Sequence, residues 1–293
     1  PAMQSSGSDA PPRRWHVSAV NECRLCHNAG SGFVLGFHPH QLHRSVTRSS
    51  NLRYADQLQQ LQSEQVIAKA PPISVHDPQR LVDPHDETQS LEDRARSYLH
   101  GNCSSCHHPG GNAIVSFYLK REMPFAKLNT NKGTGIGTFG MKNAKLIVPG
   151  DPYRSVLFYR MMKLGYARMP YIGTYQVDSR GVVLIEQWIR NMPSKNSNLD
   201  SAPLKTSSPE RSALAKLEAH GKPLPASDPS IRQLVGSTEG ALALAASMHA
   251  GRSRTNAERI YRQSEPDIRG LFESFVRSEE HTSELQSRQY LVC

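Results

Sequence analysis

Two copies of one short cysteine motif constrain this chain of 293 residues more than any other feature. The first copy is Cys23-Arg24-Leu25-Cys26-His27, and the second is Cys103-Ser104-Ser105-Cys106-His107. In the pattern C-x-x-C-H, two thiols three positions apart reach the two vinyl groups on one edge of a porphyrin, and the adjacent histidine binds the iron. The repeated motif therefore predicts two covalently attached haem c groups, with His27 and His107 as iron ligands.

Three other uses of paired cysteines compete with haem attachment. Two C-x-x-C knuckles could bind zinc, but zinc binding leaves both histidines without a role. A thioredoxin-like redox pair belongs beside a βαβ pattern, which this sequence does not show. A disulfide inside each C-x-x-C would be strained. We favour haem attachment because it uses the cysteines and the histidines together.

A methionine in a loop predicts the sixth ligand of the second haem. Met169 comes sixty-six residues after Cys103, lies between two predicted helices and is followed by Pro170. This order is typical of a small class I cytochrome c, and a thioether opposite histidine raises the reduction potential. Met161 and Met162 are alternative sulfur donors, although their spacing places them inside a helix.

The sixth ligand of the first haem stays open between several donors. Three histidines follow the first motif closely, and two methionines come later in the chain. A ligand from sequence before Pro1, or a five-coordinate iron open to peroxide or small gases, would serve equally. The candidate residues are His38, His40, His43, Met123 and Met141.

Hydrophobic spacing and cap signals predict a mainly α protein with long irregular loops and a helical C-terminal extension. The haem motifs and the Met169 loop between helices add the expectation of cytochrome c-like haem domains. Ser90 with Asp93 predicts a helix start, and Gly101 with Asn102 predicts its end directly before the second motif. Further helices are predicted over 51–68, from Asp151-Pro152 to Gly165, over Asp178–Asn191 and, as two or three helices, over 229–276. The helix over Asp178–Asn191 is expected to bury one face, formed by Val182, Ile185, Trp188 and Ile189.

The expected domain organisation has five parts. A first haem-binding segment and a class I cytochrome c-like domain carry the two motifs, and a linker rich in Ser, Pro, Lys and Ala separates them from a helical connector. The expected boundaries are 1–87, 88–198, 199–228 for the linker, 229–276 for the connector and 277–293 for a tail.

The net charge of +9 says little about function by itself. The Lys and Arg residues are scattered and match no nucleic-acid module, so we expect a solvated basic surface and no nucleic-acid partner. An acidic redox partner or an anionic surface would suit such a charge. No apolar run is long enough to span a membrane. The sequence from Pro1 shows no signal peptide, which we interpret as the start of a fragment or a processed product.

The chain resembles a family of exported bacterial di-haem c-type cytochromes between Trp15 and Met192. The resemblance implies covalent haem, a periplasmic or otherwise exported location, and electron transfer. It also implies a β-rich segment before the first motif, of which only the end is present. The matching blocks are Glu22–His27, Leu35-Gly36-Phe37, Gln41–Arg44, Arg94–His107, Val148–Pro152 with Ser155, Arg168-Met169-Pro170 and Trp188-Ile189.

Two further resemblances concern the C-terminal end. Residues 240–245 and 266–275 resemble a helical connector that leads into another haem domain in large multi-domain bacterial cytochromes. Residues 277–287, RSEEHTSELQS, resemble the translation of a sequencing-library adapter. We therefore expect 277–293 not to belong to the natural protein, and Cys293 carries no inference.

Taken together, these patterns predict an electron carrier rather than a catalyst, and they indicate no catalytic residue. We expect the electron carrier to have a redox partner protein, such as a membrane-associated protein or a dehydrogenase. The sequence does not identify this partner. Two alternatives are a di-haem peroxidase or oxidase with an open first haem, and a haem-binding module of a larger dehydrogenase assembly.

Overall fold

The computed structural model confirms a mainly α protein. It describes residues 19–35, 38–43, 46–48, 52–54, 57–69, 77, 79–135, 137–174, 176–193 and 209–276. Trp15, residues 194–198 at the end of the expected cytochrome c-like domain, residues 199–208 of the expected linker and the tail 277–293 lie outside these ranges. Within them, every helix is too short or too polar to cross a membrane.

Two compact units divide the chain at other places than the expected domain boundaries. We call Arg24–Asn129 the motif unit, and residues 1–23 together with 130–293 the helical unit. The helix α1 (Val20–Cys26) runs across the division. The motif unit then contains η1 (Ala29–Ser31), α2 (Pro39–Leu42), β1 (Val46–Arg48), β2 (Leu52–Tyr54), α3 (Gln57–Ser63), α4 (Leu91–Cys103) and η2 (Phe125–Lys127).

A short hairpin replaces the start of one predicted helix. β1 and β2 pair antiparallel, with Thr47 opposite Arg53. The helix expected over 51–68 therefore begins only at Gln57 and ends at Ser63. Pairing with a neighbouring strand overrides the helical spacing that Leu52 contributes, since strand formation depends strongly on context.

The helix α4 carries the second cysteine motif at its end. Ser90 is its N-cap, as predicted, and its Oγ accepts a hydrogen bond from the Asp93 amide at 3.1 Å. The predicted stop at Gly101-Asn102 is wrong, because the helix continues to Cys103. The side chain of Asn102 donates to the Tyr98 carbonyl, one turn earlier, and so is compatible with the helical backbone.

The helical unit begins with the elements that surround Met169. These are η3 (Pro152–Arg154), α5 (Val156–Met162) and α6 (Ser179–Asn191). Asp151 caps η3 and Asp178 caps α6, so both predicted starts are confirmed, although the first opens a 3-10 turn. The buried face of α6 contains the four predicted residues, Val182, Ile185, Trp188 and Ile189.

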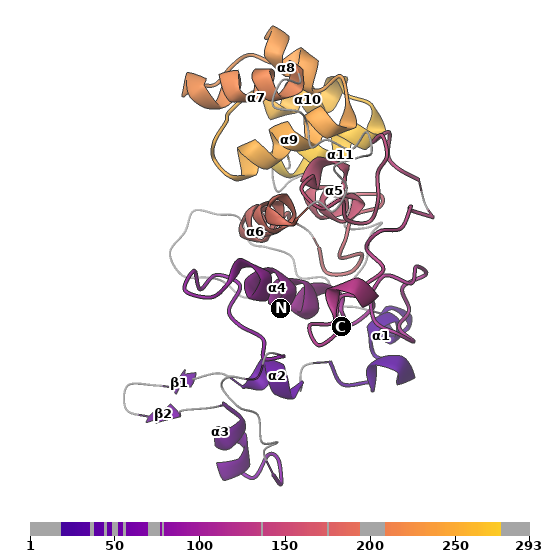
Figure 1. The fold of residues 1–293 in the computed structure, drawn as a ribbon, viewed down its shortest axis with the longest axis vertical. Helices are drawn as coiled ribbons and strands as arrows, with labels where there is room; N and C mark the ends of the chain where they lie inside the picture. Colours follow the sequence, from indigo (N-terminus) through magenta and orange to yellow (C-terminus); the bar gives the residue numbers. More distant parts are fainter. Residues whose placement is uncertain are drawn as a thin grey trace. The chain divides into compact units, whose positions relative to one another are not determined.

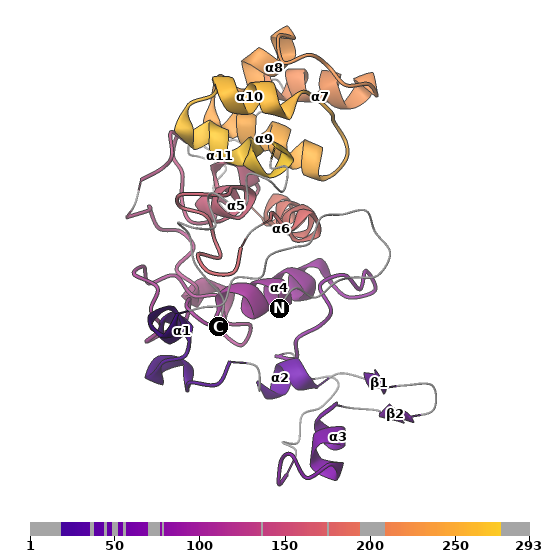
Figure 2. The same cartoon turned by 180° about the vertical axis from the view of Figure 1, so that it is seen from behind.

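Within the described residues 209–276, the helical unit contains five more helices, in orange to yellow in Figure 1 and from behind in Figure 2. One of them, α7, lies inside the segment expected to be a linker, and four rather than two or three fall within 229–276. They are α7 (Pro209–His220), α8 (Pro229–Leu234), α9 (Thr238–His249), α10 (Ala257–Gln263) and α11 (Pro266–Val276).

The helix α9 forms the centre of the helical unit. It packs against α5, α6, α7, α8, α11 and η3. Its residues from Ala241 to Ala246 are at most 1% exposed. A helix that is apolar on all sides is buried on all sides, and its many alanines let neighbouring helices approach closely. The C-terminal extension therefore packs directly on α5 and α6.

Polar contacts reinforce this packing at the end of α9. His249 Nδ1 lies 2.9 Å from Ser179 Oγ at the start of α6, and Nε2 lies 3.3 Å from Ser274 Oγ in α11. The ring also packs on Phe275, with 4.3 Å between ring centroids. Burial lowers the pKa of His249 to about 4, so this imidazole is neutral in the folded protein at neutral pH.

We expect acid to destabilise the helical unit through His249. Its folded pKa is about 4, whereas an unfolded histidine has a pKa of about 6.5, so the unfolded chain binds the proton first. The stability that the neutral ring contributes is thus complete above pH ~6.5 and is lost as the pH falls towards 4. Urea unfolding of a His249→Gln variant should show a weaker dependence on pH in this window than the parent.

The matched control is His220→Gln, because His220 is exposed at the end of α7. This variant should keep the pH dependence of the parent. An equal slope for His249→Gln and the parent would contradict the assignment.

Candidate functional site

The first motif lies at the end of α1 and in the loop that follows it. The Asn28 side chain caps η1, Gly32 takes a left-handed backbone conformation, and the chain turns back so that the Phe33 carbonyl meets His27. His27 Nδ1 is 2.6 Å from that carbonyl oxygen. Because a carbonyl only accepts, Nδ1 carries the proton and Nε2 keeps its lone pair for a metal.

The cysteines of the first motif differ in state. Cys26 is a free thiol, whereas Cys23 is disulfide-bonded. Thioether formation needs both residues as thiols, so Cys23 must be reduced before a haem can attach there.

The second motif forms a tight turn at the end of α4. The Cys103 carbonyl accepts hydrogen bonds from the amides of Cys106 (3.2 Å) and His107 (2.9 Å). Both cysteines are free thiols. Burial raises the pKa of Cys103 to about 12. The turn thus places two thiols and one imidazole within a single short segment.

His107 repeats the arrangement of His27 in a more buried place. Its Nδ1 lies 3.1 Å from the Phe117 carbonyl oxygen, and its side chain is buried. The Phe117 ring stands edge-on, with 5.5 Å between centroids, and the Leu119 amide donates to the His107 carbonyl at 2.8 Å. The hydrogen bond from Nδ1 to a carbonyl orients an imidazole ligand and raises the basicity of its other ring nitrogen.

The end of the first motif adjoins the second motif within the motif unit. Cys26 Sγ lies 3.7 Å from Cys106 Sγ. The Asn112 side chain donates to the Leu25 carbonyl at 2.9 Å. A hydrogen bond from Cys26 lowers the pKa of Cys106 to about 6, and the same contact raises the pKa of Cys26.

Met169 lies in the loop between α5 and α6, as predicted. Its amide donates to the Arg160 carbonyl at 2.9 Å, and its side chain is half-buried. Met161 and Met162 are buried in α5, as expected for core residues. Met169 belongs to the helical unit and His107 to the motif unit, so their pairing across one haem stays a prediction.

The candidate ligands of the first haem fall in different surroundings. His38 packs between two other histidines, with ring centroids 5.4 Å from His40 and 5.1 Å from His100. Burial lowers the pKa of His38. Both Met141 and His43 are buried, and Met123 is half-buried. None of these contacts singles out one residue as the ligand.

The donors of both motifs suit haem attachment. Each motif contributes an imidazole whose Nδ1 is held by a carbonyl, and three of the four motif cysteines are free. Over the described parts of the chain, no three His, Cys, Asp or Glu side chains cluster to hold a metal ion. The carbonyls of Phe33 and Phe117 were not predicted, because a backbone acceptor leaves no signal in residue type.

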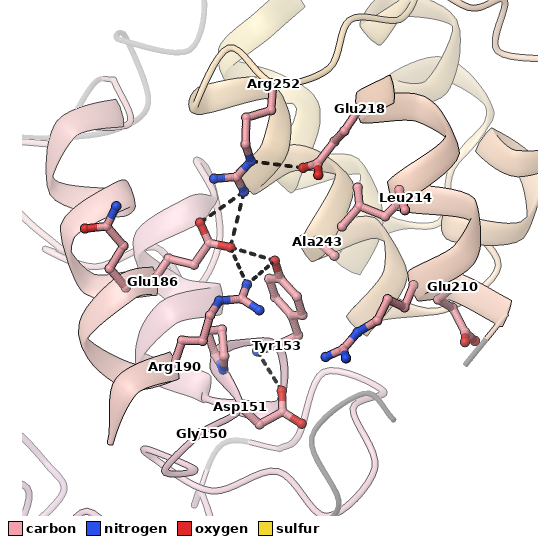
Figure 3. Close-up of a pocket in the computed structure, with 14 residues that line it drawn as sticks. Gly150, Asp151, Tyr153, Glu186, Arg190, Glu210, Leu214, Glu218, Ala243 and Arg252 are labelled. Carbon is pink, nitrogen blue, oxygen red and sulfur yellow. Dashed lines mark hydrogen bonds and ion pairs between the residues drawn. The ribbon is translucent and has the colours of Figure 1, made fainter. Parts of the chain in front are cut away.

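A pocket of about 280 Å³ in the helical unit is the other candidate site (Figure 3). Glu186 lies at its wall with a side chain that is only 3% exposed. Its carboxylate accepts hydrogen bonds from the Tyr153 hydroxyl at 2.6 Å and from Arg190 at 2.8 Å, and it pairs with Arg252 at 3.3 Å. Arg252 also donates to Glu218 at 2.9 Å.

These charges satisfy one another and join α6 to the C-terminal helices. Arg252 follows α9, and Glu218 lies on α7, so the network connects three parts of the helical unit. The spacing of Glu186 and Arg190, four residues apart on a helix, was the only sequence signal for it. We assign the network a structural role.

Glu186→Ala should lower the free energy of unfolding by about 1–3 kcal/mol, because Tyr153 and two guanidinium groups lose their acceptor. The value lies below the range for fully buried pairs because Arg190 and Arg252 are 45% and 40% exposed and can be rehydrated. Urea unfolding followed by circular dichroism measures the change.

The control for this prediction is Glu258→Ala. Glu258 pairs with Arg262 on the surface, with side chains 57% and 74% exposed, and should cost less than about 0.5 kcal/mol. Equal effects of the two substitutions would show that the Glu186 network contributes no more than a surface pair.

Comparison with known proteins adds no family: no family model matches the chain, and neither a curated protein nor a solved structure matches it significantly.

Proposed function

We propose that this chain is a di-haem c-type cytochrome that transfers electrons by an outer-sphere mechanism, with two covalently bound haem c groups. The observation that carries the proposal is the shared geometry of the two motif histidines. In both histidines, Nδ1 is hydrogen-bonded to a backbone carbonyl, which leaves Nε2 as the atom available to bind iron. A histidine that only filled space would not need the same partner type in two unrelated loops.

Each motif residue has a defined task in this proposal. Cys23 and Cys26 attach one porphyrin, Cys103 and Cys106 attach the other, and His27 and His107 bind the irons. The bound haem supplies the redox chemistry. The protein holds each imidazole in one tautomer and orientation through the Phe33 and Phe117 carbonyls, which strengthens it as a ligand.

Residues 88–198 would form the class I cytochrome c-like domain. The order of elements supports this: α4, the second motif, irregular loops, α5, the Met169 loop and α6. Met169 would be the sixth ligand of the second haem and would raise its reduction potential. Met161 and Met162 lie in the core of the helical unit and are therefore poor candidates.

Transfer between the two haems and to a partner would follow from the placement of the motifs. The 3.7 Å between Cys26 Sγ and Cys106 Sγ supports close approach of the two attached porphyrins. The net charge of +9 favours an acidic redox protein as partner. Function in the periplasm, or elsewhere outside the cytoplasmic membrane, accords with covalent haem and is part of the same proposal.

One observation favours a second candidate, a di-haem peroxidase or oxidase. The first motif is open: α1 has no buried residue, and Phe33 and Val34 beside His27 are 59% and 64% exposed. A five-coordinate first haem would then be accessible to peroxide. A high-spin ferric signal with peroxide turnover would favour this enzyme, whereas low-spin iron without turnover favours the carrier.

The central test is the number of covalent haems. Chain produced with the c-type maturation machinery should give a pyridine haemochrome spectrum and an intact mass for two haems. The double variants Cys103→Ala/Cys106→Ala and Cys23→Ala/Cys26→Ala should each retain one. Protein without haem that contains zinc by elemental analysis would overturn the proposal in favour of a four-thiolate metal site.

A second test concerns Met169. Met169→Ala should remove the sulfur-to-iron charge-transfer band of the ferric protein and lower the potential of one haem only, because a thioether ligand raises it. Met248→Leu is the control, since Met248 is a half-buried methionine near the end of α9 and is not a candidate ligand. If the band survives in Met169→Ala and disappears in the control, the ligand assignment is wrong.

A further inference from the structure

Two thiols from different motifs form a close pair. Cys26 is the last residue of α1, and Cys106 lies in the turn after α4. Their sulfur atoms are 3.7 Å apart, and both residues are free and half-buried. They are eighty positions apart in the chain, so the fold rather than sequence proximity brings them together.

Contacts to the backbone hold the loop that follows each motif in place. The Asn112 side chain donates to the Leu25 carbonyl at 2.9 Å, one residue before Cys26. Gly30 packs so tightly that a Cβ there would lie 2.3 Å from the Gly110 carbonyl oxygen. A Cβ on Gly111 would likewise lie 2.3 Å from the Cys106 carbonyl oxygen. The two sulfurs are thus positioned by the loops on both sides.

We propose that Cys26 and Cys106 form an inter-motif disulfide when the haem-free chain meets a disulfide oxidant. A disulfide requires about 2.05 Å between the sulfurs, so a small movement from 3.7 Å suffices.

The reaction is ordinary thiol–disulfide exchange. The Cys106 thiolate attacks one sulfur of a small disulfide such as oxidised glutathione, and the first glutathione leaves as a thiol. Cys26 then attacks the mixed disulfide and releases the second glutathione. Two cysteine thiols are oxidised to one disulfide, and the oxidant takes up the two electrons and both protons as two thiols.

The consequence rests on the proposed function. Because the bond takes one thiol from each motif, it would block thioether formation at both motifs at once. A disulfide inside one C-x-x-C would block only that motif. The pair would therefore make haem attachment to the whole chain depend on the thiol–disulfide balance of its compartment.

Peptide mapping tests the bond itself. The haem-free full-length chain is treated with oxidised glutathione, alkylated and digested with trypsin without reduction. Cleavage after Arg24 separates Cys23 from Cys26, so Cys26 lies in peptide 25–44 and both second-motif cysteines lie in peptide 97–120. Mass spectrometry should find these two peptides cross-linked.

Single variants identify the partner. The cross-link should persist in Cys103→Ser and disappear in Cys26→Ser and Cys106→Ser. Three results would overturn the proposal: a cross-link that persists in Cys106→Ser, an internal disulfide in peptide 97–120 with peptide 25–44 alkylated, or no bond between these peptides.

Haem loading tests the consequence. With the maturation machinery and oxidised glutathione in the growth medium, the parent chain should lose both haems, whereas Cys26→Ala should still load the second motif. Equal loading of parent and variant under oxidising conditions would refute the blocking role. Absence of haem without any oxidant would instead contradict the proposed function, while the cross-link result would stand independently.

Discussion

The hydrogen bond from an imidazole Nδ1 to a backbone carbonyl is the interaction on which both cysteine motifs depend. It fixes the tautomer and the orientation of the His27 and His107 rings. It also requires the loop after each histidine to bring a backbone carbonyl back to within hydrogen-bond distance of the ring. In the first motif, a capped 3-10 turn and a left-handed glycine accomplish the return. In the second, residues 108–116 form a longer loop that ends at Phe117.

The cysteine motifs, the caps at Ser90 and Asp178 and the buried face of α6 could be predicted because local sequence determines them. A cap needs one side chain beside its own helix, and an amphipathic face needs only periodic apolar residues. The strand at Leu52–Tyr54 escaped prediction because it depends on pairing with β1. The helix α7 was not predicted for a related reason. Its sequence contains Ser and Lys and looks like a linker, and its helix packs against α8 and α9, which are contacts that the local sequence does not reveal.

The contact between the two motifs could not have been predicted, because it joins residues eighty positions apart. No pattern in the first loop indicates that Gly30 meets the backbone at Gly110, or that Leu25 offers its carbonyl to Asn112. The sequence therefore supported two separate haem-binding segments, whereas the structure places both motif loops largely in one compact unit. Long-range backbone contacts of this kind are visible only once the chain is folded.

The position of α9 has a consequence for how the helical unit can be divided. Its alanine-rich surface packs against α5 and α6 and also against α7, α8 and α11. The helices after residue 208 are therefore not an appendage that follows a finished domain. They contribute α9 to the packing of α5 and α6, so we expect the described part of the unit to unfold as one cooperative block.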